Sequence, residues 1–225
     1  MCMAQIHSSS RQIRVFIVDD HPLICQSVEG MLATRPEMVY GGSAASCGEA
    51  LEKIKQVLPD VVLLDLGLTH SNGFELLRRM RHLLPQTGVL VFSMHDEEKF
   101  ALRAIREGAR GYMMKTAKPQ EVLKAIADVA AGQLVIGPAI QQRLLQEASG
   151  EEPLAPTPDR ILSSREWEIF ELLGKGLTMK EVSRRLRISE KTVGSFCDRI
   201  KLKLNKPRLR DVARTAQQWL CDDPF

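Results

Sequence analysis

The chain has 225 residues, of which 44% are hydrophobic and 26% are charged, and its formal net charge is +3. This length suits two small domains that each bury a core of their own. A run of about 18 apolar residues is absent, which argues against a membrane span, and five scattered cysteines without ligand spacing favour free thiols in a cytoplasmic protein.

From Ile13 to residue 132, the sequence alternates between short apolar runs, typical of strands, and segments with the spacing of amphipathic helices. Five such strand–helix units predict a parallel sheet with helices on both faces. The helix of the fourth unit, from Glu97 to Glu107, has the weakest pattern. The expected strands are Ile13–Val18, Met38–Tyr40, Val61–Leu64, Val89–Phe92 and Gly111–Met114.

Polar residues follow four of these strands at their carboxyl ends. The first strand ends in Asp19 and Asp20, the third in Asp65, the fourth in Ser93 and the fifth in Lys115. Ligands bind at this edge of an open parallel sheet, so we expect the five side chains to converge. Three carboxylates in one crevice need a cation, and Mg²⁺ prefers oxygen ligands. With Asp65 as nucleophile, and Lys115 and Ser93 holding an anion, the set predicts phosphoryl transfer onto a carboxylate.

Residues 13–132 resemble a response-regulator receiver domain, which has a flavodoxin-like (βα)5 fold. The resemblance rests on VDDHP beginning at Val18, LLDLGL around Asp65, Ser93, and GYMMK ending in Lys115. It implies that a partner histidine kinase phosphorylates Asp65.

The same resemblance assigns further roles in the pocket. The implied Mg²⁺ ligands are Asp19, Asp20, Asp65 and the Gly67 carbonyl. Ser93 and Tyr112 would form a switch pair that reorients on phosphorylation, although Tyr112 also suits an edge-strand aromatic that packs on a helix. Thr69 stands where the family often has proline, so we expect a looser loop there. Because they share no ligand spacing, we expect no metal role for His21, His70 and His95.

The composition changes after this first region. Residues 137–146 have a helical pattern, whereas 148–160 hold three prolines and several acidic residues, as linkers do. We predict a receiver domain over 12–135, a linker over 136–160 and a second domain over 161–222. Lys and Arg outnumber Asp and Glu by 14 to nine in 161–225, against 16 to 16 in 1–150. This asymmetry suits a polyanion partner for the second domain.

The second domain has only helical patterns, and its helix starts are marked. Ser or Thr followed three residues later by Glu has the spacing of a capping box. The expected starts are Ser163 with Glu166, Thr178 with Glu181, Ser189, and Pro207. Four short helices predict a compact all-α domain.

Residues 162–220 resemble the LuxR-type helix-turn-helix of NarL/FixJ response regulators. The resemblance rests on LSSREWEIFELLGKGLTMKEVSRRLRISEKTV and KLKLN. The short LRIS link is the turn that lets a recognition helix enter the major groove of double-stranded DNA. The resemblance implies a transcription regulator that forms a homodimer on activation. The expected DNA contacts are Thr178, Lys180, Arg187, Lys191, Thr192, Gly194, Ser195, Asp198, Arg199 and Lys203.

The recognition helix departs from the family pattern. Relatives commonly have a basic residue after the valine and a histidine two positions later, where this chain has Gly194 and Phe196. Asp198 repels phosphates, although it can accept a hydrogen bond from a cytosine amino group. Gly194 also costs about 1 kcal/mol of helix propensity relative to alanine. We therefore expect an unusual sequence preference, and weak or conditional DNA binding stays open.

Two other functions are considered. The first is a phosphorylation-controlled co-regulator that binds protein and has little DNA binding of its own, motivated by Gly194 and Asp198. The second is a phosphatase of the haloacid dehalogenase type. Such enzymes usually have a second acid two residues after the nucleophile, where Gly67 stands here, so we expect no enzyme activity.

Overall fold

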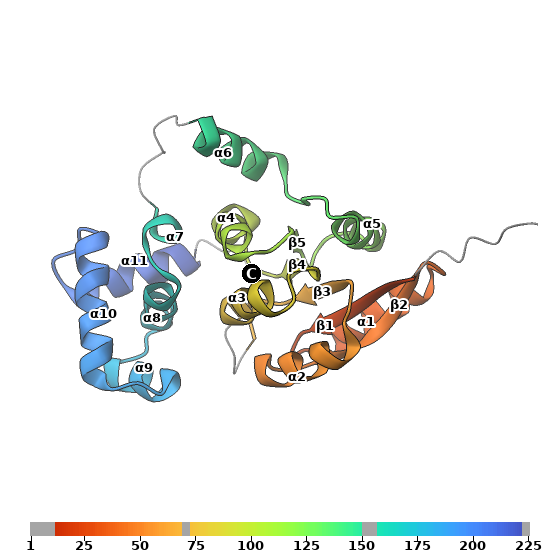
Figure 1. The fold of residues 1–225 in the computed structure, drawn as a ribbon. Coiled ribbons are helices and arrows are strands. Elements are labelled where there is room, and N and C mark those ends of the chain that lie inside the picture. Colours follow the sequence, from red (N-terminus) through yellow and green to blue (C-terminus); the bar gives the residue numbers. More distant parts are fainter. Residues whose placement is uncertain (1–11, 69–72, 150–156, 222–225) are drawn as a thin grey trace, which may run out of the picture. The chain divides into compact units, whose positions relative to one another are not determined.

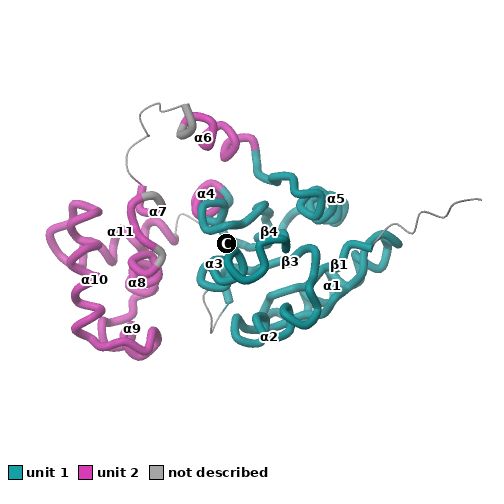
Figure 2. The backbone as a smooth tube through the Cα atoms, viewed as in Figure 1, with its two compact units in different colours: residues 1–97, 104–137 teal, residues 98–103, 138–225 magenta. Residues whose placement is uncertain are grey.

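The computed structural model describes residues 12–68, 73–149 and 157–221. The chain divides into two compact units, drawn in different colours in Figure 2: residues 1–97 with 104–137, and residues 98–103 with 138–225. None of the described helices is both long and apolar enough to cross a membrane. The domain limits expected from the sequence stay predictions.

The first unit is built on a five-stranded parallel sheet of order β2-β1-β3-β4-β5 (Figure 1). This confirms the predicted fold class. The strands are β1 Ile13–Val18, β2 Met38–Ala44, β3 Val61–Leu64, β4 Gly88–Ser93 and β5 Gly111–Met114. The helices that alternate with these strands along the chain are α1 Pro22–Ala33, α2 Cys47–Val57, α3 Gly73–Leu83, α4 Glu97–Glu107 and α5 Pro119–Ala130. Residues 98–103 of α4 are counted with the second unit.

Strand β2 is longer than its apolar run predicts. Its last residues pair with β1, Gly42 with Phe16 and Ala44 with Val18, after a register shift between Val15 and Phe16. Glycine and serine have low strand propensity, but a backbone that faces a paired neighbour gains ladder hydrogen bonds. Pairing with β1 therefore extends the strand beyond its local signal.

A buried cluster on one face of the sheet joins β1, β3 and β4 to α1 and α5. Alternate strand residues such as Val15, Leu63 and Leu90 meet Val28 of α1 and Ile126 of α5. This alternation is the period of a strand with a helix layer on each side. Because β1, β3, β4 and β5 are paired in parallel, their carboxyl ends lie along one edge of the sheet.

In the part of the second unit that the structure describes, residues 98–103 of α4 are followed by six further helices. They are α6 Pro138–Ser149, α7 Pro158–Ile161, α8 Ser164–Gly174, α9 Met179–Leu186, α10 Glu190–Lys203 and α11 Leu209–Cys221. The four predicted helices correspond to α8–α11, and short α7 precedes them.

The predicted caps form. Ser163 and Thr178 accept from the amides of Glu166 and Glu181 in reciprocal capping boxes, and Ser189 accepts from the Thr192 amide. The fourth helix begins later than expected, at Leu209 rather than at the proline.

Candidate functional site

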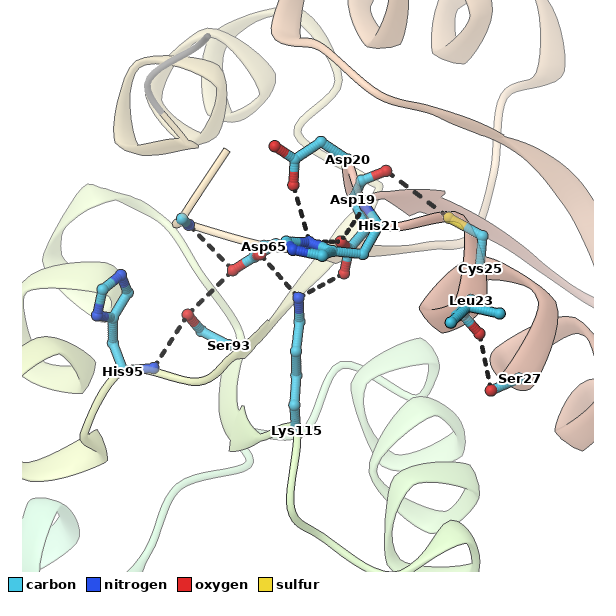
Figure 3. A network of polar contacts seen from close by, with 11 residues as sticks. Asp19, Asp20, His21, Leu23, Cys25, Ser27, Asp65, Ser93, His95 and Lys115 are labelled. Atoms are coloured by element: carbon cyan, nitrogen blue, oxygen red, sulfur yellow. Dashed lines mark hydrogen bonds and ion pairs between the residues drawn. The ribbon is translucent and has the colours of Figure 1, made fainter. Parts of the chain in front are cut away.

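The acidic residues predicted from the strand ends meet at one edge of the sheet (Figure 3). The Lys115 ammonium lies 2.6 Å from Asp19 Oδ2 and 2.7 Å from Asp65 Oδ2. The other Asp65 oxygen, Oδ1, accepts hydrogen bonds from the Ser93 hydroxyl and the Gly67 amide, each at 3.0 Å. Asp65 thus lies at the centre of a network built from the carboxyl ends of four strands, β1, β3, β4 and β5.

Burial strengthens this network. Asp19 is 4% exposed, Asp65 5% and Ser93 0%. Burial lowers the pKa of Lys115, but hydrogen bonds and attraction from Asp19 and Asp65 outweigh it, so the net pKa lies above its usual value. The amine therefore stays charged at neutral pH and neutralises part of the acidic pocket.

His21, for which we expected no metal role, lies in the same pocket. Its Nδ1 lies 3.1 Å from Asp19 Oδ1 and 3.0 Å from Asp20 Oδ1, and its amide donates to Asp19 Oδ1 at 2.9 Å. The only available signal was its position directly after the two aspartates. His70 and Thr69 lie outside the described residues.

The donor set fits a divalent cation. One ligand atom each from Asp19, Asp20, His21 and Asp65 lie within 4.8 Å of one another. Three of the four are carboxylates, which Mg²⁺ prefers. The Gly67 amide is committed to Asp65, and a metal contact of the Gly67 carbonyl stays a prediction.

Ser93 and Tyr112 are linked through His95. The Tyr112 hydroxyl donates to the His95 carbonyl at 2.8 Å, and the His95 amide donates to the Ser93 hydroxyl at 3.3 Å. Tyr112 is 2% exposed, on the edge strand β5. This arrangement is compatible with either interpretation of Tyr112, and the switch role stays a prediction.

Gly73, the first residue of α3, packs directly under the Asp65 strand end. A Cβ there would lie 2.7 Å from Leu66 Cα and 2.8 Å from the Asp65 carbonyl oxygen. We expect Gly73→Ala to lower the free energy of unfolding by about 1–3 kcal/mol through overpacking. It should also displace Asp65.

Urea unfolding of the full chain measures this effect. Gly48→Ala on α2 is the matched control, because a Cβ at Gly48 meets nothing within 4 Å. A Gly73→Ala protein as stable as the control would contradict the close packing.

The predicted DNA contacts gather on α9 and α10, with Arg187 at the turn between them. Arg187 follows the last turn of α9 in the left-handed conformation, at φ 53°. Thr178 caps the start of the same helix through hydrogen bonds with Glu181. Lys180 follows on α9. On α10, Lys191, Thr192, Ser195, Asp198 and Arg199 are exposed, while Val193, Cys197 and Ile200 form its buried face.

The structure shows the surroundings of three unusual residues of the recognition helix, Gly194, Asp198 and Phe196. A Cβ at Gly194 would meet only the Met179 side chain, at an ordinary 3.5 Å, so packing does not require glycine there. Asp198 pairs with Lys201 at 2.8 Å, which offsets its repulsion of phosphates. The Arg199 guanidinium stacks over Phe196, 4.3 Å from the ring centre. The set of residues that contacts DNA stays a prediction.

Comparisons with known families match both units. Residues 15–127 match the response regulator receiver domain family, and residues 160–216 match the bacterial regulatory proteins of the luxR family.

Curated relatives cover nearly the whole chain. The DNA-binding transcriptional activator DevR/DosR of Mycobacterium tuberculosis is 32% identical, over 89% of this chain and 92% of the relative. The nitrate/nitrite response regulator protein NarL of Escherichia coli is 29% identical, over 93% and 95%. The oxygen regulatory protein NreC of Staphylococcus carnosus is 32% identical, over 89% and 96%.

Solved structures agree. A LuxR-family two-component response regulator from Aurantimonas is 33% identical with a TM-score of 0.55, covering 61% of this chain and 99% of that one. RcsB from Salmonella enterica serovar Typhimurium, bound to a promoter, has a TM-score of 0.70 over 94% of this chain and 100% of that one; at 20% identity it shows the fold alone. The chain therefore belongs to the NarL/FixJ subfamily of response regulators, which join a receiver domain to a LuxR-type DNA-binding domain.

Proposed function

We propose that Asp65 accepts a phosphoryl group from a partner histidine kinase, and that this modification controls DNA binding by the second unit. The observation that carries the proposal is the placement of Asp65 between the Lys115 ammonium and the Ser93 hydroxyl, beside two further carboxylates. We place this regulator in the cytoplasm, acting on double-stranded DNA as a homodimer.

The chemistry follows from the groups around Asp65. A carboxylate oxygen attacks the phosphorus of the phosphohistidine, the P–N bond breaks, and an acyl phosphate forms. Asp19, Asp20 and Asp65 would hold Mg²⁺, whose positive charge would stabilise the phosphoryl oxygens. Lys115 and Ser93 are placed to orient those oxygens through an ion pair and a hydrogen bond.

Phosphorylation can reach the rest of the unit through Ser93. A phosphoryl group adds nearly two negative charges at one strand end. Ser93 then exchanges its hydrogen bond to Asp65 for one to the phosphate, which alters the contact with His95 and the Tyr112 hydroxyl. A two-state surface biased in this way can control dimerisation and DNA binding.

Enzymatic turnover is not part of this proposal. A phosphatase with an aspartate nucleophile would need an acid near residue 67, where the chain has glycine. The chain belongs to a family of transcription regulators, and no finding favours the protein-binding co-regulator.

The test is labelling of the full-length protein with acetyl phosphate, followed by a band shift on duplex DNA. We expect label in the presence of Mg²⁺, little label after EDTA treatment, and stronger DNA binding by the labelled protein. Labelling at an equal rate in EDTA would contradict the metal requirement. Equal DNA binding by labelled and unlabelled protein would contradict the control by phosphorylation.

A further inference from the structure

One of the cations on α10 is engaged inside the second unit. The Lys203 ammonium lies 2.7 Å from Glu166 Oε2, although the two residues are 37 positions apart in the sequence. The Glu166 side chain is only 2% exposed, and that of Lys203 is 40% exposed. The pair thus joins the last turn of the recognition helix to the first turn of α8.

Glu166 also holds the start of α8. Its Oε2 accepts the Ser163 amide at 2.8 Å, while the Glu166 amide donates to the Ser163 hydroxyl at 3.4 Å. Burial raises the pKa of Glu166, but hydrogen bonds from Lys203 and Ser163 outweigh it, so the net pKa is lowered. The carboxylate is therefore ionised at neutral pH and needs its cation.

The ion pair distinguishes Lys203, although its side chain is 40% exposed, from cations of α10 that have no buried partner. Removing the lysine would leave the buried Glu166 carboxylate without its cation, which is costly. Lys203 therefore loses an interaction inside the protein if it turns toward a phosphate. Lys191, in the first turn of α10, is exposed and has no side-chain ion pair among the residues that the structure describes.

We propose that Lys203 is a positioning residue for DNA recognition: its ion pair with Glu166 sets the orientation of α10 on α8, and it makes no phosphate contact. The inference rests on the proposed DNA binding, and it replaces the expectation that Lys203 contacts DNA. Because the ion pair fixes the C-terminal end of α10 on α8, residues nearer the N-terminus of α10 can reach the base edges.

The dependence of DNA affinity on salt separates positioning from phosphate contact. A residue that neutralises one phosphate contributes about 0.9 to the slope of log affinity against log salt concentration. We would compare full-length wild-type, Lys203→Met and Lys191→Met proteins after acetyl phosphate treatment. The probes are a duplex selected from a random library by the wild-type protein, and poly(dI-dC) as nonspecific DNA.

We expect Lys203→Met to weaken binding to the selected duplex by about tenfold, the loss typical of one misaligned base contact. Its salt slope and its affinity for poly(dI-dC) should equal those of the wild type. Lys191→Met is the matched control and should lower the slope by about 0.9. Lys203→Arg keeps the ion pair and should restore binding to the selected duplex.

Two results would overturn the inference. A slope reduced by about 0.9 in Lys203→Met would make the residue a phosphate contact. Unchanged affinity in a protein that a thermal melt shows to be folded would reduce the pair to a purely structural role.

Hydrogen exchange on the DNA-free protein gives a second, independent measurement. We expect faster exchange of the amides from Asp198 to Lys203 in Lys203→Met, and wild-type rates in Lys203→Arg. Equal rates in all three proteins would overturn the inference even if DNA affinity changed. If the wild-type protein selects no duplex, the proposed DNA binding fails, and the exchange rates alone decide the role of the ion pair.

Discussion

An Asp65→Asn protein is expected to take up no phosphoryl group from acetyl phosphate. An amide is too weak a nucleophile to form the acyl phosphate, although its shape matches the carboxylate. The amide oxygen can still accept from Ser93 and Gly67, whose donors both face Oδ1. The amide nitrogen would then face the Lys115 ammonium, which we expect to keep its ion pair with Asp19.

Labelling of the full-length protein, with the thermal melt recorded beside it, measures this effect. Asp128→Asn on α5 is the matched control, because it makes the same chemical change away from the pocket. It should label at the wild-type rate. Label on the Asp65→Asn protein at a rate near that of the control would place the phosphorylated residue elsewhere.

Replacement of Lys115 by alanine is expected to slow labelling of Asp65 by about 10²–10³-fold, the loss typical of one preorganised electrostatic group. The ammonium is 2.6 Å and 2.7 Å from two buried carboxylates, so its charge is fixed where phosphoryl oxygens would arrive. Its removal also leaves Asp19 and Asp65 in mutual repulsion. We therefore expect the variant to be less stable without Mg²⁺.

The initial rate of labelling at saturating Mg²⁺ measures the catalytic part of this effect. Lys124→Ala, an exposed lysine on α5, is the matched control and should be neutral. A thermal melt with and without Mg²⁺ reports the repulsion separately. If Lys115→Ala labelled as fast as the control, the ammonium would have no part in the transfer.

Local patterns account for most of the elements. The predicted bounds of β1, β3 and β5 agree with the structure, and so do the predicted helix caps Ser163, Thr178 and Ser189. Both signals are encoded within a few residues, because a strand needs only a short apolar run and a cap needs one side chain near a free amide. Such short-range signals do not predict the end of a strand when pairing with a neighbouring strand sets it, as it does for the last residues of β2.

The pocket was predictable for a related reason. In a parallel sheet, all carboxyl ends lie at one edge, so aspartates at those ends must be neighbours once the strands are adjacent. The local sequence pattern did not predict how the side chains in the pocket contact one another. The contact of His21 with Asp19 and Asp20 depends on how the chain turns into α1.

The sequence by itself determined the two-part organisation, the strand–helix alternation, the helix caps, and the acids and lysine of the pocket. Each of these follows from short-range periodicity or from the type of residue at a strand or helix end. Only the tertiary structure decided the strand order and the partner of each charge. Lys203 shows the physical reason: an exposed cation and a phosphate ligand look alike in sequence, and only packing of α8 against α10 brings the buried Glu166 carboxylate within 2.7 Å.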